Sequence, residues 1–72
     1  MDYRLKSGRE VGIRQDKTGG WRVVYLDNER TMTNGAVPYQ KGKDAKRRAE
    51  RLLDKAVKEG KGVFNGASPL GK

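Results

Sequence analysis

Arginine recurs once in each of three short segments whose residues favour β-strands: Arg14, Arg22 and Arg30. A guanidinium group carries a rigid fork of N–H donors, so it can bond a guanine edge or a phosphate through two parallel hydrogen bonds. If the three strands are neighbours, alternation places these arginines on one face of the sheet. We expect that face to enter the major groove of double-stranded DNA, although solvent-facing charges that prevent edge aggregation give the same pattern.

Other basic residues would add charge to this contact. They are Lys17, in the first predicted turn, and Arg4, Lys6 and Arg9, near the N-terminus. A basic arm can lie along phosphates or in the minor groove, but a loosely held terminus needs no such role. The chain has 17 Lys and Arg against 9 Asp and Glu, a formal charge of +8. This excess favours a polyphosphate partner, and it is also compatible with simple solvation of a small domain.

The strands that would hold the arginines follow from the local pattern. Residues 11–15 alternate apolar with small or polar side chains, and 16–20 form a turn whose paired glycines allow positive φ. Residues 21–26 are the most β-prone run and are apolar on both faces, as in a central strand. After a turn at 27–29, residues 30–33 are predicted as the third strand.

A helix is predicted over 43–59. Its apolar residues recur at helical spacing, namely Ala45, Ala49, Leu52, Leu53, Ala56 and Val57. It lacks a good N-cap residue, whereas Gly60 is placed for a left-handed C-cap. The Asn34-Gly35 pair is a hairpin signal, but the segment after it soon reaches a proline, so we expect a loop leading to the helix.

These elements predict an α+β domain over 11–59, with a three-stranded antiparallel sheet packed against one C-terminal helix in the order β-β-β-α. Residues 1–10 are expected to be a flexible basic arm, and 60–72 a flexible tail or linker. Within that tail, Val63 and Phe64 are expected to pack against the edge of the core.

Catalysis has little support in the sequence. The chain has no His and no Cys, so the commonest proton shuttle and metal ligands are missing. Ser7 and Ser68 fall in the predicted flexible ends, and the carboxylates of Asp16, Asp27 and Glu29 fall in turns. We therefore expect a binding protein, not an enzyme, with no cofactor, metal or small-molecule substrate.

No apolar run is long enough to cross a bilayer, and the polar N-terminus has no secretion-signal pattern. We expect no membrane partner, and a cytoplasmic location on the nucleoid when the chain is bound to DNA.

Two other partners stay open. If Trp21 and Tyr25 face the helix, then Val24, Leu26 and Met32 form an apolar strip on the outer face that would suit a protein partner, as in a small phage-type regulator. If the strand is flipped, Trp21 and Tyr25 face outward and would stack on the bases of RNA or single-stranded DNA. Core placement of Trp21 is favoured because few other large residues can cover the helix.

The outer stripe of the predicted helix is also basic, with Arg47, Arg51, Lys55 and Lys58. It could bind phosphates or anionic lipid, but its apolar side lacks the aromatic residues of a membrane-surface helix. Pairing of Glu50 with Lys46, and of Asp54 with Lys58, at i,i+4 spacing favours a solvated face.

One family shows a similar succession of motifs. A glycine turn, the run from Trp21 to Tyr25, a charged turn, a third strand and Lys41-Gly-Lys-Asp-Ala45 opening a helix resemble the N-terminal arm-site-binding domain of phage and transposon tyrosine integrases. Residues 12–15 also resemble the first strand of the plant ethylene-response-factor DNA-binding domain. Both families place the sheet in the major groove, so the resemblance implies that Arg14 and Arg22 contact DNA. The resemblance to the integrases also implies a role in DNA recombination in a phage or other mobile element.

The similarity covers about residues 11–58 and departs from the family at two places. Val24 and Leu26 stand where polar DNA-contacting residues are common, and residues 36–40 replace the usual Gly-Phe-x-Thr entry to the helix. These residues contain no recombinase catalytic domain, so we expect an excised domain or a stand-alone protein.

Overall fold

The two longest strands of the sheet form a β-hairpin. In the computed structural model, which describes residues 1–71, β2 (Glu10–Gln15) pairs antiparallel with β3 (Trp21–Tyr25). Ile13 lies opposite Val23, and both are buried on the side that faces the helix. Because side chains alternate along a strand, Arg14 and Arg22 project from the other side, which we call the outer face. The two predicted strands and the turn between them are confirmed.

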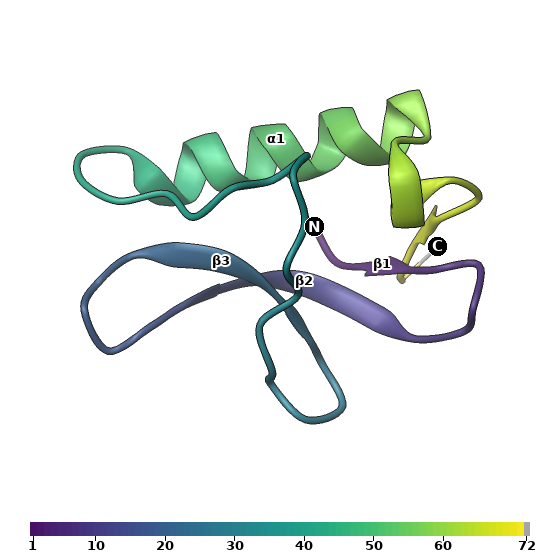
Figure 1. Ribbon diagram of the computed structural model, residues 1–72, viewed down its shortest axis with the longest axis horizontal. Helices are drawn as coiled ribbons and strands as arrows, with labels where there is room; N and C mark the ends of the chain where they lie inside the picture. Colours follow the sequence, from purple (N-terminus) through teal and green to yellow (C-terminus); the bar gives the residue numbers. More distant parts are fainter. Residues whose placement is uncertain (72) are drawn as a thin grey trace.

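The sheet has four strands, not three, in the order β3-β2-β1-β4 (Figure 1). The added strands are β1 (Tyr3–Arg4) and β4 (Ser68–Pro69), which pair with each other, and β1 also pairs with β2. They come from the segments predicted to be a flexible arm and a flexible tail. The apolar side chains of Tyr3 and Leu5 are buried in the core, which explains why the N-terminal segment lies against β2.

The predicted third strand at 30–33 is reduced to a single bridge between Thr31 and Val24. Two backbone hydrogen bonds flank it, from the Tyr25 N–H to the Arg30 carbonyl (2.9 Å) and from the Met32 N–H to the Val23 carbonyl (2.9 Å). Pairing stops here because Met32, only 6% exposed, enters the core. The chain then leaves β3 and returns to it at Gln40, which exchanges two backbone hydrogen bonds with Trp21 (2.8 and 3.0 Å), before it reaches the helix. Figure 1 shows this path.

The helix α1 spans Ala45–Glu59 and packs on β2 and β3. Its buried residues are Ala45, Ala49, Leu53 and Ala56, as the helical spacing predicts. Gly60 ends it in the left-handed conformation, with φ of 64°. The helix is not C-terminal in the fold, since the 3-10 turn η1 (Gly62–Phe64) and strand β4 follow it.

Arg48 organises the loop that leads into α1. Its guanidinium donates to the main-chain carbonyl oxygens of Lys41 (2.7 Å) and Lys43, and to the side-chain oxygen of Gln40 (3.1 Å). Asp44, at the N-cap position, makes no capping hydrogen bond through its side chain. Arg48 therefore fixes the loop that a capping residue would otherwise hold.

The core lies between α1 and the inner face of the sheet, and the chain's only phenylalanine is part of it. Phe64 is 1% exposed, whereas its neighbour Val63 is 55% exposed, so the expected packing of this pair is confirmed for Phe64 alone. Within residues 1–71, no helix has the length and apolar character needed to cross a membrane.

Candidate nucleic-acid interface

Arg14 and Arg22 face each other across the hairpin on the outer face. They are direct cross-strand partners in the β2–β3 register, which places their Cβ atoms about 4.5–5.5 Å apart. The predicted common face of these two arginines is confirmed. Like charges directly opposite each other destabilise a sheet, so this pair needs compensation from elsewhere.

Arg30 does not share that face, contrary to the prediction. The bridge places Thr31 opposite Val24, so Thr31 projects from the outer face. Arg30 is one residue earlier and has the opposite parity, on the side that Met32 takes. A strand shifted by one residue presents all its side chains to the other face, and burial of Met32 sets the register here.

Arg4, and not Arg30, is the third arginine on the outer face. In β1 it pairs with Glu10, which has the same parity as Arg14 along β2. The distance along the strand from Glu10 to Arg14 is roughly 13 Å. One arginine from each of three strands does project from the outer face, but the strands are β1, β2 and β3. The sequence prediction missed this because a strand of two residues has no periodicity to detect.

Each of these arginines is bonded to a carboxylate. Arg4 donates to Glu10 at 2.7 Å, and Arg22 donates to Asp16. Arg14 donates to the two carboxylate oxygens of Asp2 at 3.4 and 3.3 Å. Asp2 can lie there because Gly12 has no side chain, as an ideal Cβ on Gly12 would be 2.2 Å from the Asp2 Oδ1 atom. The N-terminal segment thus supplies the charge that compensates Arg14.

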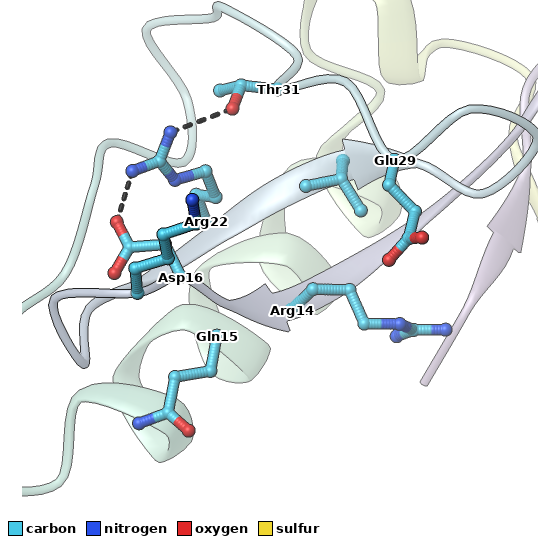
Figure 2. A pocket seen from close by; sticks show the side chains of 8 residues that line it. Arg14, Gln15, Asp16, Arg22, Glu29 and Thr31 are labelled. Carbon is cyan, nitrogen blue, oxygen red and sulfur yellow. Dashed lines mark hydrogen bonds and ion pairs between the residues drawn. The ribbon is translucent and has the colours of Figure 1, made fainter.

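Between β2, β3 and the following loop lies an open hollow of about 240 Å³ (Figure 2). Val24 is one of its lining residues and is only 4% exposed. The guanidinium group of Arg22 points toward Asp16 and Thr31, while that of Arg14 points away from them, on the side of Glu29 (Figure 2). Two guanidinium groups therefore line the hollow, and they point in different directions.

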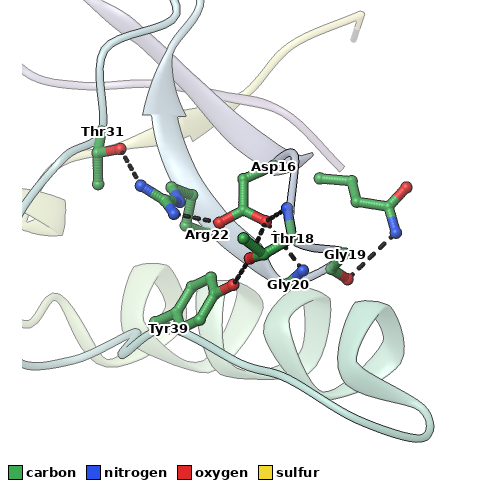
Figure 3. Close-up of polar contacts among 8 residues, drawn as sticks. Asp16, Thr18, Gly19, Gly20, Arg22, Thr31 and Tyr39 are labelled. Atoms are coloured by element: carbon green, nitrogen blue, oxygen red, sulfur yellow. Dashed lines mark hydrogen bonds and ion pairs between the residues drawn. The ribbon is translucent and has the colours of Figure 1, made fainter.

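A hydrogen-bond network holds Arg22 (Figure 3). Its Nη1 donates to the Thr31 hydroxyl at 2.8 Å, and its Nη2 donates to Asp16. Asp16 also accepts from the Thr18 hydroxyl (2.8 Å) and from the Gly20 N–H (3.0 Å). Burial alone would raise the pKa of Asp16, but hydrogen bonds from Thr18, Tyr39, Arg22 and the Gly20 backbone hold it well below its usual range. Asp16 therefore stays charged at neutral pH and fixes Arg22.

Tyr39 completes this network and explains the second glycine of the turn. Its hydroxyl lies 2.8 Å from the Thr18 hydroxyl, and its ring centroid lies 5.0 Å from the Arg22 guanidinium carbon. Gly19 has a φ of 89°, but Gly20 has no positive φ. Gly20 is needed for space instead, because a Cβ there would be 1.9 Å from the Tyr39 hydroxyl oxygen.

We therefore expect Gly20→Ala to destabilise the fold by about 1–3 kcal/mol, since the Tyr39 ring must leave its contacts with Thr18 and Arg22. Urea denaturation measures the loss. Tyr39→Ala is the matched variant: in the double variant Gly20→Ala/Tyr39→Ala the two losses should not add, because the ring is already absent. Additive losses would show that Gly20 acts through something other than Tyr39.

The expected apolar strip on the outer face does not form. Met32 belongs to the core, Val24 is buried beside the loop that carries Thr31, and Leu26 is half-buried. Trp21 and Tyr25 pack against the core on the helix side, as predicted for Trp21. The surfaces required for protein docking on this strip, or for base stacking on these rings, are therefore not exposed on the outer face.

The remaining predicted residues have different positions. Lys17 is exposed in the turn and lines the hollow, so it joins the outer face. Arg9 donates to Asp27 at 3.0 and 3.3 Å and lies 3.6 Å from the Tyr25 ring centroid, at the other end of the hairpin. Lys6 lies close to Gly66. The structure therefore places only some of the basic residues predicted to bind DNA on the outer face.

The outer face carries little net charge. Its basic residues are Arg4, Arg14, Lys17 and Arg22, and its acidic residues are Asp2, Glu10, Asp16 and Glu29. Four positive charges therefore meet four negative ones, which makes this face suited to directional hydrogen bonding more than to long-range attraction of phosphates.

No protein-family model, curated protein or solved structure matches the chain. The resemblance to integrase arm-site domains remains a prediction.

Proposed function

We propose that the chain binds double-stranded DNA by placing the β2–β3 hairpin in the major groove, with no enzymatic step. The observation that carries this proposal is the cross-strand pair of Arg14, which is exposed, and Arg22, which is partly exposed, on the outer face of the β2–β3 hairpin. The major groove admits such a ribbon, and its guanine edges accept the paired hydrogen bonds of a guanidinium group.

Arg14 is the residue we expect to contact DNA directly. Its side chain is 46% exposed and its bonds to Asp2 are long, at 3.3 and 3.4 Å, so a base edge or phosphate can displace that carboxylate. Arg22 is 34% exposed and bonded on both sides, to Asp16 and Thr31, so its main role is to hold the face in position. Lys17 at the turn would reach a phosphate.

Arg4 extends the contact along the sheet. It projects from β1 on the same face, and its partner Glu10 belongs to β2. The resemblance of residues 11–58 to integrase arm-site domains supports the same use of the sheet. By that similarity, the proposed process is DNA recombination in a phage or mobile element, with the chain on the nucleoid of the cytoplasm.

A pair of charge-matched variants tests the proposal. We expect Arg14→Gln to weaken binding to short random-sequence duplexes by roughly tenfold, at the lower end of what a bidentate arginine contributes. Arg30→Gln removes the same charge from an exposed residue off the outer face and should change affinity by less than about twofold. Fluorescence anisotropy at two salt concentrations gives both affinities.

Two results would contradict the sheet contact. Equal losses for Arg14→Gln and Arg30→Gln would show that only overall charge matters, not the outer face. Wild-type affinity that does not fall as salt rises would remove the premise that phosphates are contacted at all.

A further inference from the structure

The excess positive charge of the chain gathers on the side opposite the hairpin's outer face. Six basic residues lie along the exposed side of α1 and in the loop before it, and we call them the helix basic face: Lys41, Lys43, Arg47, Arg51, Lys55 and Lys58. Every one of them is exposed. Because α1 packs on β2 and β3 with its other side, the helical members of this face, Arg47, Arg51, Lys55 and Lys58, point away from the sheet (Figure 1).

The acids of the helix are bonded to other groups. Glu50 pairs with the amino group of Met1, Asp54 accepts a hydrogen bond from the Tyr3 hydroxyl, and Glu59 pairs with Lys61 at 3.3 Å. The pairs expected at i,i+4 spacing, Glu50 with Lys46 and Asp54 with Lys58, are absent from the ion pairs of residues 1–71. Lys46 instead lies 5.4 Å from the centroid of the Trp21 ring.

Within the described residues, no member of the helix basic face lies within 4 Å of a carboxylate. Four acids lie in the same stretch of chain, Asp44, Glu50, Asp54 and Glu59, but Glu50 is paired with the Met1 amino group and Glu59 with Lys61. On the outer face every arginine has its own carboxylate. On the sheet side, carboxylates therefore neutralise the charges of the arginines. On the helix side, the positive charges remain available to bind a polyanion.

The dimensions of the helix basic face match a DNA strand. From Arg47 to Lys58 the helix rises roughly 16 Å, and its basic side chains recur at about 6 Å where they are four residues apart. One DNA strand carries a phosphate about every 3.4 Å along the axis, so this row spans roughly five phosphates. Arg48 fixes the backbone of Lys41 and Lys43, which holds their positions at one end of the row.

The same surface does not suit a membrane. Its residues are Lys and Arg, and the apolar residues of α1 are on the side that packs into the core. A helix that binds the membrane surface needs apolar side chains to enter the acyl region beside its charges.

We propose that the helix basic face binds the phosphate backbone of double-stranded DNA without sequence preference. This contact needs nothing from the outer face. Where the proposed function also holds, the two sites lie on opposite sides of a domain whose shortest extent is 23 Å, so they engage different duplexes. The chain then bridges two DNA segments, one held through the hairpin and one through the helix.

The test combines salt-dependent binding with capture of a second duplex. In the double variant Arg47→Gln/Arg51→Gln, the slope of log affinity against log salt should fall by about 1.8, since each lost phosphate contact removes about 0.9. Thermal melting should show no loss of stability, because Arg47 is in the first helical turn, where positive charge is unfavourable. For capture, a biotinylated duplex is fixed on beads, the protein is added, and retention of a fluorescent second duplex is measured.

Wild-type protein should retain the second duplex, and the helix double variant should retain at least about tenfold less, as two lost phosphate contacts imply. Arg14→Gln separates the two proposals. If it has no effect while the helix variant loses duplex affinity, the sheet contact fails and the helix contact stands. An unchanged salt slope in the helix variant would overturn the helix contact, as would binding to anionic phospholipid vesicles in preference to duplex DNA.

Discussion

Replacing Phe64 with alanine is expected to unfold the chain at room temperature. Phe64 is 1% exposed and is among the largest fully buried side chains. Truncating a buried Phe to Ala costs about 3–5 kcal/mol, because apolar contacts are lost and a cavity remains. A chain of this length has only about 3–5 kcal/mol of net stability, so the loss consumes nearly all of it. Circular dichroism and urea denaturation measure the effect.

Two neighbouring changes act as controls. Phe64→Leu keeps most of the buried volume and should cost about 1–1.5 kcal/mol, leaving the chain folded. Val63→Ala alters a residue that is 55% exposed and should stay within about 0.5 kcal/mol of wild type. If Phe64→Ala melted like Val63→Ala, the segment after α1 would not be part of the core.

The N-terminal segment should prove equally necessary. Tyr3 is buried in the core, and its hydroxyl donates to Asp54 on α1, which links β1 to the helix. We expect Tyr3→Ala to destabilise the fold by about 3 kcal/mol, near the lower end for loss of a buried aromatic ring. Urea denaturation gives the value. A loss below about 0.5 kcal/mol would show that residues 1–10 are the flexible arm predicted from the sequence.

Tyr3→Phe isolates the hydroxyl, and its effect depends on pH. Burial, the hydrogen bond to Asp54 and the negative charges of Asp54 and Glu50 together raise the pKa of Tyr3 from the ordinary 10.0 to about 12. Keeping Tyr3 neutral therefore stabilises the fold fully below pH 10.0, and this contribution is lost as pH rises toward about 12.

In Tyr3→Phe this alkaline loss should be smaller, and the tyrosinate absorbance step near pH 12 should disappear. Denaturation curves and absorbance titrations of the two proteins across that pH window measure both effects. Identical alkaline profiles would show that ionisation of the Tyr3 hydroxyl does not destabilise the fold.

The elements with a clear internal period were predictable. The hairpin alternates with a period of two, and α1 repeats its small and apolar residues at helical spacing, so each element specifies its own buried side. Together these periods place Arg14 and Arg22 on a common face, and Gly60 marks the end of the helix. The basic stripe of α1 was visible from the same helical spacing.

The compensation of charge was not predictable, because it depends on residues that approach from distant segments. Asp2 reaches Arg14 from the N-terminal segment, and Asp27 reaches Arg9 from the turn after β3. Asp54 is near Lys58 in sequence, yet it accepts a hydrogen bond from Tyr3. The count of charges therefore indicated a basic chain, while the pairing of charges determined which side of it remains basic.

The sequence by itself determined the hairpin, the helix and the net charge, because each depends on neighbours a few residues apart. Only the tertiary structure decided that β1 and β4 join the sheet, since two-residue strands are not stable by themselves. Buried Tyr3 holds β1 in place, whereas both residues of β4 are exposed and this strand follows the buried Phe64. The tertiary structure also decided the side on which Arg30 projects, because burial of Met32 sets that register.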